Sequence, residues 1–277
     1  MILATWQFAP AVSIPLILLA ALYLGGTRPV ARRHPARPWP RSRALSFAAG
    51  LAAVAVATQG PDAVYDDVLL TAHMVQHLLL IMVAPPLLIY GRPVTLLLHA
   101  TRGPWHRRVR RVVRSRAVTA LTWPPLTVAL YSAVVLGTHL TPLLFARGWL
   151  HDSEHLAYLA AGYLLFLPVV GSEPGHWRLT ILGRYLLLLA AMPTDIITGA
   201  VLMLSGPLRG YPAPDVTAAG LIMVAGGEAI MAVLAMGLAV QLVRKPVPAR
   251  PPDAQLTAYN TMLASLEPAA DDGRRPG

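Results

Sequence analysis

The chain has 277 residues, of which 55% are hydrophobic and only 13% are charged. Soluble globular proteins carry roughly 25% charged residues, so this composition and the mean hydropathy of +0.54 exclude an ordinary soluble fold. The absence of cysteine excludes disulfide frameworks, cysteine-based zinc sites and redox-active dithiols. The net charge of +10 raises the question of a nucleic-acid partner, and the positions of the basic residues answer it.

Hydrophobic runs long enough to cross a hydrocarbon core of ~30 Å occur seven times. Such runs are expected to be helices, because backbone groups in a bilayer must pair within their own segment. We therefore predict an all-α integral membrane protein, a bundle of seven transmembrane helices. The spans are expected at about Phe8–Gly25, Ala44–Gln59, Val68–Tyr90, Ala117–His139, His151–Gly171, Tyr185–Ser205 and Val216–Val243.

The basic residues fix the expected orientation. Of the 23 Lys and Arg residues, 21 fall on one side of these spans, and only Arg147 and Arg209 fall on the other. The positive-inside rule makes the basic side cytoplasmic, with the N-terminus outside and the C-terminus inside. We expect these arginines to fix topology and contact anionic headgroups, so no nucleic-acid partner is predicted. Because no basic residue precedes Phe8, the first span is interpreted as a retained anchor.

The sequence changes character after the seventh span. We predict a transmembrane domain over 1–243 and a cytoplasmic tail over 244–277. The tail begins with a proline-rich linker and ends in a stretch without an expected fold. Between them, helix-compatible spacing predicts a short amphipathic helix on the membrane or a partner, with apolar positions at Leu256, Tyr259, Leu263 and Leu266.

Histidines at membrane depth carry the candidate chemistry. Four of the nine histidines lie in arginine-rich loops, where solvated surface roles are expected: His34, His99, His106 and His176. The other five belong to the outer halves or ends of the third, fourth and fifth spans: His73, His77, His139, His151 and His155. Four of these form two i, i+4 pairs, His73/His77 and His151/His155, each sharing a helix face, and topology places all five in one leaflet. Ionisable side chains in a lipid-embedded bundle are costly and usually mark a site, although imidazoles also hydrogen-bond between packed helices.

Two acidic residues lie within the last two spans. Asp195 follows Pro193 in the sixth span, and Glu228 follows two glycines in the seventh. Their depth allows four alternative roles: supporting groups for the imidazoles, direct metal ligands, proton relays, or structural hydrogen-bond acceptors. Imidazoles with carboxylates suit zinc or oxidised copper equally well. Since four ligands normally suffice, at least one of the five histidines is expected to do something else.

The run from His73 to Pro93, HMVQHLLLIMVAPPLLIYGRP, resembles the signature of the CtaG-type cytochrome c oxidase assembly proteins, a bacterial seven-helix membrane family. Further matches are Thr138–Pro142, His151–Leu156 and the stretch leading to Glu228. The resemblance implies an assembly factor, not an enzyme, in the bacterial plasma membrane, acting on aa- or caa-type oxidases. It implies copper as the metal, with oxidase subunits, the lipid bilayer and a copper chaperone as partners. Zinc is the alternative ion.

Three other functions would also use membrane-embedded histidines. A zinc-dependent intramembrane hydrolase would hold the ion with three histidines and activate water with Asp195 or Glu228. A haem or electron-transfer protein would use histidines from different helices as axial ligands. A copper permease would need a polar path through both leaflets, and the inner halves of the spans offer few coordinating groups.

Overall fold

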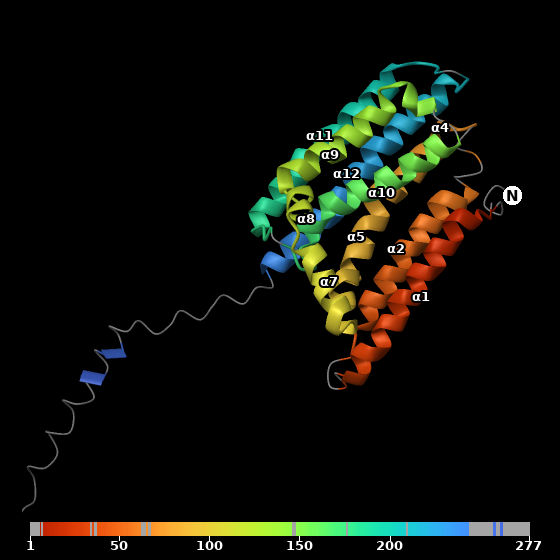
Figure 1. Ribbon diagram of the computed structural model, residues 1–277. Helices are drawn as coiled ribbons and strands as arrows, with labels where there is room; N and C mark the ends of the chain where they lie inside the picture. The colour runs from red at the N-terminus through yellow and green to blue at the C-terminus, as the bar shows by residue number, and fades with distance from the viewer. Residues whose placement is uncertain are drawn as a thin grey trace, which may run out of the picture. The chain divides into compact units, whose positions relative to one another are not determined.

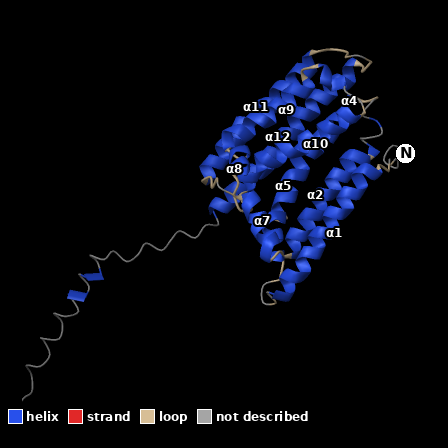
Figure 2. Ribbon diagram, in the orientation of Figure 1, coloured by secondary structure: helices blue, strands red, loops and turns tan. Residues whose placement is uncertain are grey.

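The structure is a computed structural model. It describes residues 6, 8–33, 35, 38–61, 65, 68–145, 148–175, 177–208, 210–243, 257–258 and 261–262. Within these ranges the elements are helices, and an isolated β-bridge joins Leu208 to Tyr211 (Figure 2). The all-helical prediction is therefore confirmed for the part of the chain that is described.

The chain divides into two compact units, Met1–Leu238 and Ala239–Gly277. The predicted boundary between residues 243 and 244 stays a prediction. In the second unit, residues 257–258 and 261–262 are helical, and the positions that define the predicted tail helix lie outside the described residues: Leu256, Tyr259, Leu263 and Leu266.

The first unit is a bundle in which long helices run side by side (Figure 1). The long helical segments are α1 (Pro10–Arg33), α2 (Arg41–Gln59), α4 (Leu70–Leu78) continuing through the π-helix η2 (Leu79–Val83) into α5 (Ala84–Tyr90), α9 (Pro124–His139), α10 (Trp149–Val170), α11 (Ile181–Leu204) and α12 (Ala213–Val243). Helix α2 packs against α1 and α5, while α10 packs against α5, η2 and α9. Short elements connect them: α6 (Pro93–Ala100), α7 (Gly103–Val113), α8 (Arg116–Leu121) and the 3₁₀ turn η3 (Pro142–Phe145).

Five of the described helices are long and apolar enough to cross a membrane: α1, the run Leu70–Ala100, α10, α11 and α12. A multi-pass membrane protein is thus supported, while the sequence predicted seven spans. Helix α9 has 16 residues, or roughly 24 Å at 1.5 Å per residue, which is shorter than a hydrocarbon core. Helix α2 begins with two arginines within its first three residues.

Two predicted boundaries are wrong. The first span was expected to end at Gly25, but α1 continues to Arg33 and packs against α6. The fourth span was expected to start at Ala117, but the chain turns between α8 and α9. Pro124 restricts the preceding residue, and Trp123 is extended, with φ −65° and ψ 122°.

The helix carrying His73 and His77 contains a π-helical turn just before its proline pair. Pro85 has no N–H to donate to the Ile81 carbonyl four residues earlier, so the helix widens there instead of breaking. Gly162 of α10 lies against that carbonyl: a Cβ on Gly162 would be 2.1 Å from the Ile81 oxygen. This contact sets how closely α10 approaches α4 and η2.

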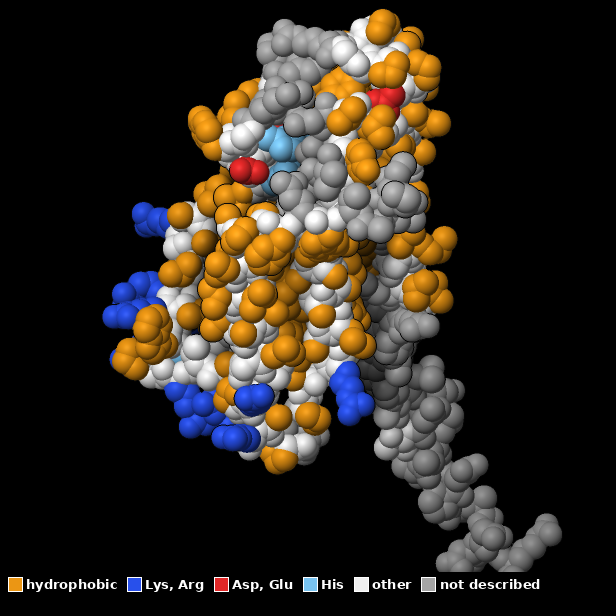
Figure 3. Space-filling view, turned by 90° about the vertical axis from the view of Figure 1, so that its right-hand side faces the viewer, with side chains coloured by type: hydrophobic (Ala, Val, Ile, Leu, Met, Phe, Trp, Pro, Cys, Tyr) orange, Lys and Arg blue, Asp and Glu red, His pale blue; other side chains and the backbone are white. Residues whose placement is uncertain are grey.

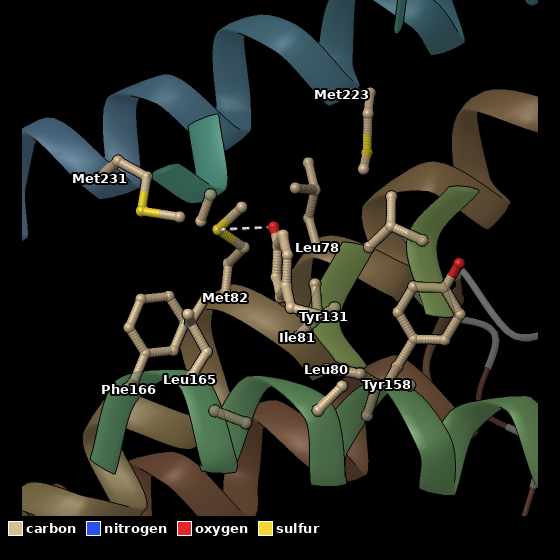
Figure 4. Close-up of a cluster of buried hydrophobic side chains, with 14 of the residues drawn as sticks. Leu78, Leu80, Ile81, Met82, Tyr131, Tyr158, Leu165, Phe166, Met223 and Met231 are labelled. Carbon is tan, nitrogen blue, oxygen red and sulfur yellow. Dashed lines mark hydrogen bonds between the residues drawn. The ribbon is translucent and has the colours of Figure 1, made fainter. Parts of the chain in front are cut away.

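Large, mostly apolar side chains fill the centre of the bundle. Tyr131, Tyr158, Phe166 and Met82 are among those buried completely. Figure 4 shows Met82 and Tyr131 meeting there, with the Tyr131 hydroxyl 3.9 Å from the Met82 sulfur. Close packing on both sides of the helices that bear the histidines leaves their side chains little freedom.

Candidate metal centre

Five imidazoles from three helices meet at one end of the bundle. His73 and His77 lie on α4, His139 is the last residue of α9, and His151 and His155 lie in the first two turns of α10. The ring centroids of the two i, i+4 pairs are 4.1 and 4.3 Å apart. Across helices, the His77 ring lies 5.2 Å from that of His139, 6.2 Å from that of His151 and 6.1 Å from that of His155. The structure thus brings together all five histidines that the sequence singled out.

The cluster contains two groups of three histidines, and His77 belongs to both. The ligating nitrogens of His73, His77 and His139 lie within 4.8 Å of one another, as do those of His77, His151 and His155. The first group is buried, whereas His151 and His155 are partly exposed. We call these the inner and the outer triad. An ion held by either triad would contact His77.

The His139 ring is held in one orientation. Its Nδ1 donates to the Val135 carbonyl at 2.9 Å and lies 2.9 Å from the Tyr158 hydroxyl. With the proton on Nδ1, the lone pair is on Nε2, which lies 3.4 Å from His77 Nδ1. Two nitrogens bound to one tetrahedral metal at 2.0–2.1 Å would be roughly 3.3 Å apart. The spacing therefore fits a shared ion as well as a hydrogen bond between the rings.

Two buried nitrogens of the histidine cluster have no hydrogen-bond partner among the described residues. They are the Nε2 atoms of His73 and His77, two residues that are only 5% and 1% exposed. Buried polar atoms are nearly always paired, since leaving one unpaired costs free energy. Neutral imidazole nitrogens with free lone pairs are donors that zinc and copper prefer.

Three residues around the histidines were not predicted. The Tyr158 ring stacks on His77 at 4.0 Å, and its hydroxyl also contacts Thr138. The Glu154 carboxylate is buried, 3.6 Å from His151 Nδ1, and neither of its oxygens has a hydrogen-bond partner among the described residues. The spacing 151, 154, 155 and 158 on α10 is the signal that would have found Glu154 and Tyr158, because these positions share one helix face.

An acidic residue from α12 fixes the start of α4. The N-cap residue of α4 is Leu69, which offers no side-chain acceptor. The Asp215 carboxylate replaces it: it accepts from Leu70 N at 2.7 Å, from Thr71 N at 3.3 Å and from the Thr71 hydroxyl at 2.8 Å. Charge-assisted capping of this kind sets the register of α4 and so the height of His73 and His77.

The two acids of the last spans lie deeper in the bundle. Both oxygens of Asp195 are 2.9 Å from the Tyr131 hydroxyl, and Tyr131 is two helical turns before His139 on α9. Glu228 has one buried oxygen without a hydrogen-bond partner. Within the described residues, neither acid belongs to a three-residue group with the imidazoles. Their supporting role toward the histidines stays a prediction.

The loop histidines behave differently. His99 Nδ1 donates to the Thr95 carbonyl at 2.9 Å, and His106 Nδ1 donates to the Leu98 carbonyl at 3.1 Å. These local bonds agree with structural surface roles. His34 and His176 lie outside the described residues.

A multi-helix membrane protein with a buried histidine cluster is thus the class that fold and site define. The profile of the cytochrome c oxidase caa3 assembly factor family matches residues 21–245, and the chain belongs to this family. The resemblance found in the sequence is confirmed.

Among curated proteins, the chain is 31% identical over 212 residues to uncharacterized proteins of Mycobacterium bovis and Mycobacterium tuberculosis. It is 29% identical over 208 residues to an uncharacterized protein of Mycobacterium leprae. These alignments cover 73% and 72% of this chain but only 32% and 31% of the relatives, so the chain spans about a third of their length. No solved structure matches it.

Proposed function

We propose that this protein supplies copper to a cytochrome c oxidase during assembly, using the five-histidine cluster to hold the ion. The observation that carries the proposal is the inner triad, three buried imidazoles whose nitrogens lie within 4.8 Å of one another. Membership of a family of oxidase assembly factors supports the recipient. In this proposal copper is cargo, and the protein is not an enzyme.

The proposal includes seven crossings, with the N-terminus outside and the histidines toward the outer surface of a bacterial plasma membrane. Figure 3 supports this orientation, since Lys and Arg side chains gather toward one end, His side chains lie toward the other, and hydrophobic side chains cover the surface between. Helices α2 and α9 would cross within the bundle, where packing against neighbours compensates for their lower length or hydropathy.

The two triads suggest a transfer route. The outer triad is the more exposed, so a copper chaperone outside the membrane would deliver the ion to His151 and His155. Because His77 belongs to both triads, the ion would pass to His73 and His139 by exchanging two ligands while keeping one. Copper accepts all-imidazole coordination, and the chain has no thiol to hold it more tightly. An oxidase subunit would then take the ion by the same kind of exchange.

Metal content of the purified protein tests this proposal. Wild-type protein loaded with copper is compared with five single alanine variants, at His73, His77, His139, His151 and His155, and with His106→Ala as the matched loop control. We expect stoichiometric copper in wild type and control, and the largest loss in His77→Ala. Equal copper in wild type and His77→Ala, with both proteins monodisperse, would contradict the metal centre.

A zinc-dependent hydrolase remains a second candidate because of Glu154. A buried carboxylate beside a histidine cluster is where a hydrolase would place its general base, and Glu154 satisfies this position better than Asp195 or Glu228. Stoichiometric zinc together with hydrolysis of a lipid amide or ester, lost in Glu154→Gln, would favour the enzyme. Retention of oxidase assembly in Glu154→Gln would favour copper delivery.

A further inference from the structure

A cavity of about 730 Å³ lies at the end of α10 opposite the histidines. It is formed where α6 and the start of α7 face the loop between α10 and α11. At 1.5 Å per residue, the start of this loop at Gly171 is roughly 24 Å along α10 from His155. The cavity is therefore separate from the metal centre, and its volume is that of a small-ligand pocket.

Positive charge dominates its lining. Arg92, Arg178 and Arg184 line the cavity together with His99 and His106, and Glu173 supplies the one carboxylate among the described lining residues. Guanidinium groups stay protonated at all physiological pH values, so the lining carries an excess of fixed positive charge.

The carboxylate is already engaged. Glu173 accepts from the backbone N–H groups of Val94 and Thr95, each at 2.9 Å, and from the Thr95 hydroxyl at 2.5 Å. It thereby caps α6, whose N-cap residue Arg92 makes no side-chain cap. The single charge of Glu173 is thus shared between α6 and Arg92, so it does not balance the three arginines of the lining.

Two of the arginines are held at a structural cost. Arg92 has the left-handed conformation, φ 54° and ψ 52°, which is uncommon for a residue with a Cβ and is enriched at functional sites. The Arg184 guanidinium lies over Gly171, where a Cβ would be 2.4 Å from Nη2, and Nη1 donates to the Val170 carbonyl at 3.5 Å. Arg184 Nε is buried without a hydrogen-bond partner.

We propose that this cavity binds a phosphate-bearing anion through Arg92, Arg178 and Arg184. Guanidinium groups recognise phosphate oxygens by paired N–H donors, and three guanidinium-bearing residues line this cavity. Two sources offer this chemistry: the headgroup of an anionic phospholipid, reached at the basic end of a membrane bundle, and a soluble phosphate compound.

Native mass spectrometry of the full-length protein in detergent tests the proposal. Phosphatidylglycerol, phosphatidylcholine and inorganic phosphate are titrated separately into wild type and into the Arg178→Gln/Arg184→Gln double variant. We expect wild type to bind one anionic group per chain and the double variant to bind it at least about tenfold more weakly, from the loss of charge-assisted hydrogen bonds. Arg107→Gln/Arg108→Gln on the exposed face of α7 is the matched control and should bind as wild type does.

Arg92→Asn supplies a second test, because asparagine tolerates the left-handed conformation and removes only the guanidinium. It should fold as wild type does by size-exclusion chromatography and bind more weakly. Preference for phosphatidylglycerol over phosphatidylcholine identifies a lipid headgroup, and saturable binding of inorganic phosphate alone identifies a soluble compound. Equal binding by wild type, both cavity variants and the α7 control would overturn the proposal.

Discussion

Helix α10 ends in two different chemical environments. Its N-terminal end carries His151 and His155, which face the imidazoles of α4. Its C-terminal end stops at Gly171, over which Arg184 lies at the edge of a basic cavity. Both ends bury nitrogen atoms without hydrogen-bond partners, those of His73 and His77 at one end and Arg184 Nε at the other.

The two ends differ in the protonation of their side chains. A neutral imidazole offers a lone pair, so a buried histidine cluster selects a cation. A guanidinium group has no lone pair and keeps its charge, so arginines that line a cavity select an anion. The same bundle is thus suited to a cation at one end and an anion at the other. Substitutions at each end test the two binding sites separately.

The largest effect is expected from His77→Ala, because this residue belongs to both triads. Loss of a group that only supports a ligand lowers metal affinity roughly 10–100-fold, so loss of a shared ligand should cost more. We expect terminal oxidase activity in membranes to be abolished while the abundance of this protein is unchanged. Activity assays and immunoblots of the same membranes measure the two quantities.

The control for this experiment is His106→Ala at the arginine end, which should leave oxidase activity close to wild type. Normal copper content of the oxidase in cells carrying His77→Ala would argue against delivery by this cluster.

The next effect concerns the contact that holds the helices of the metal centre together. In Gly162→Ala the new Cβ would lie 2.1 Å from the Ile81 oxygen, so α10 must move away from η2. Overpacking of this kind costs about 1–3 kcal/mol and would separate the outer from the inner triad. Thermal unfolding and copper content of the detergent-solubilised variant should both fall.

Gly137→Ala is the matched control, since a Cβ at Gly137 in α9 meets no atom within 4 Å. Helix propensity alone should then raise stability by up to about 1 kcal/mol. A Gly162→Ala protein as stable as Gly137→Ala would show that the close contact does not fix the spacing of α10.

Sequence predicted the histidine end well because two independent patterns agreed there. Hydropathy gave the helices that carry His73, His77, His139, His151 and His155, and arginine positions assigned these residues to one side. What the pattern does not contain is the rotation of each helix about its axis. Tyr158 stacking on His77 and Asp215 capping α4 depend on that rotation, so neither was predicted.

The arginine end was predicted only in outline. Its basic residues were assigned to topology and headgroup contact, because a charge count cannot tell a solvated arginine from one lining a cavity. The cavity depends on the left-handed Arg92 and on the path of the loop after Gly171, which are decided by packing between distant segments.

A smaller effect at the histidine end is expected from Tyr158→Phe. The ring that stacks on His77 remains, and the hydroxyl beside His139 Nδ1 is lost. Since Val135 still accepts from His139, we expect a loss of copper affinity of about tenfold, the low end for a supporting group. Copper titration of purified protein measures it. An affinity unchanged from wild type would mean that the Val135 carbonyl alone orients the ring.

The smallest effect is expected from Glu173→Gln, which removes the one carboxylate among the described residues that line the cavity. Burial raises the pKa of Glu173, and hydrogen bonds from Thr95 and Val94 and the charge of Arg92 partly offset this rise. Acidification therefore protonates Glu173 at a higher pH than a free glutamate, and anion binding should strengthen as the negative charge disappears. Glutamine mimics the protonated form, and its amide oxygen can still accept from one of the two α6 N–H groups.

We accordingly expect Glu173→Gln to bind phosphatidylglycerol about three- to tenfold more tightly than wild type near neutral pH, as expected for one screened charge. The variant should also lose the part of the strengthening on acidification that comes from protonating Glu173, since the phosphodiester itself does not titrate there. Asp152→Asn makes the same charge change at the histidine end of α10 and should alter neither quantity. If Asp152→Asn strengthened binding as much as Glu173→Gln, the effect would come from net charge and not from the cavity, and the two ends of α10 would not be electrostatically separate.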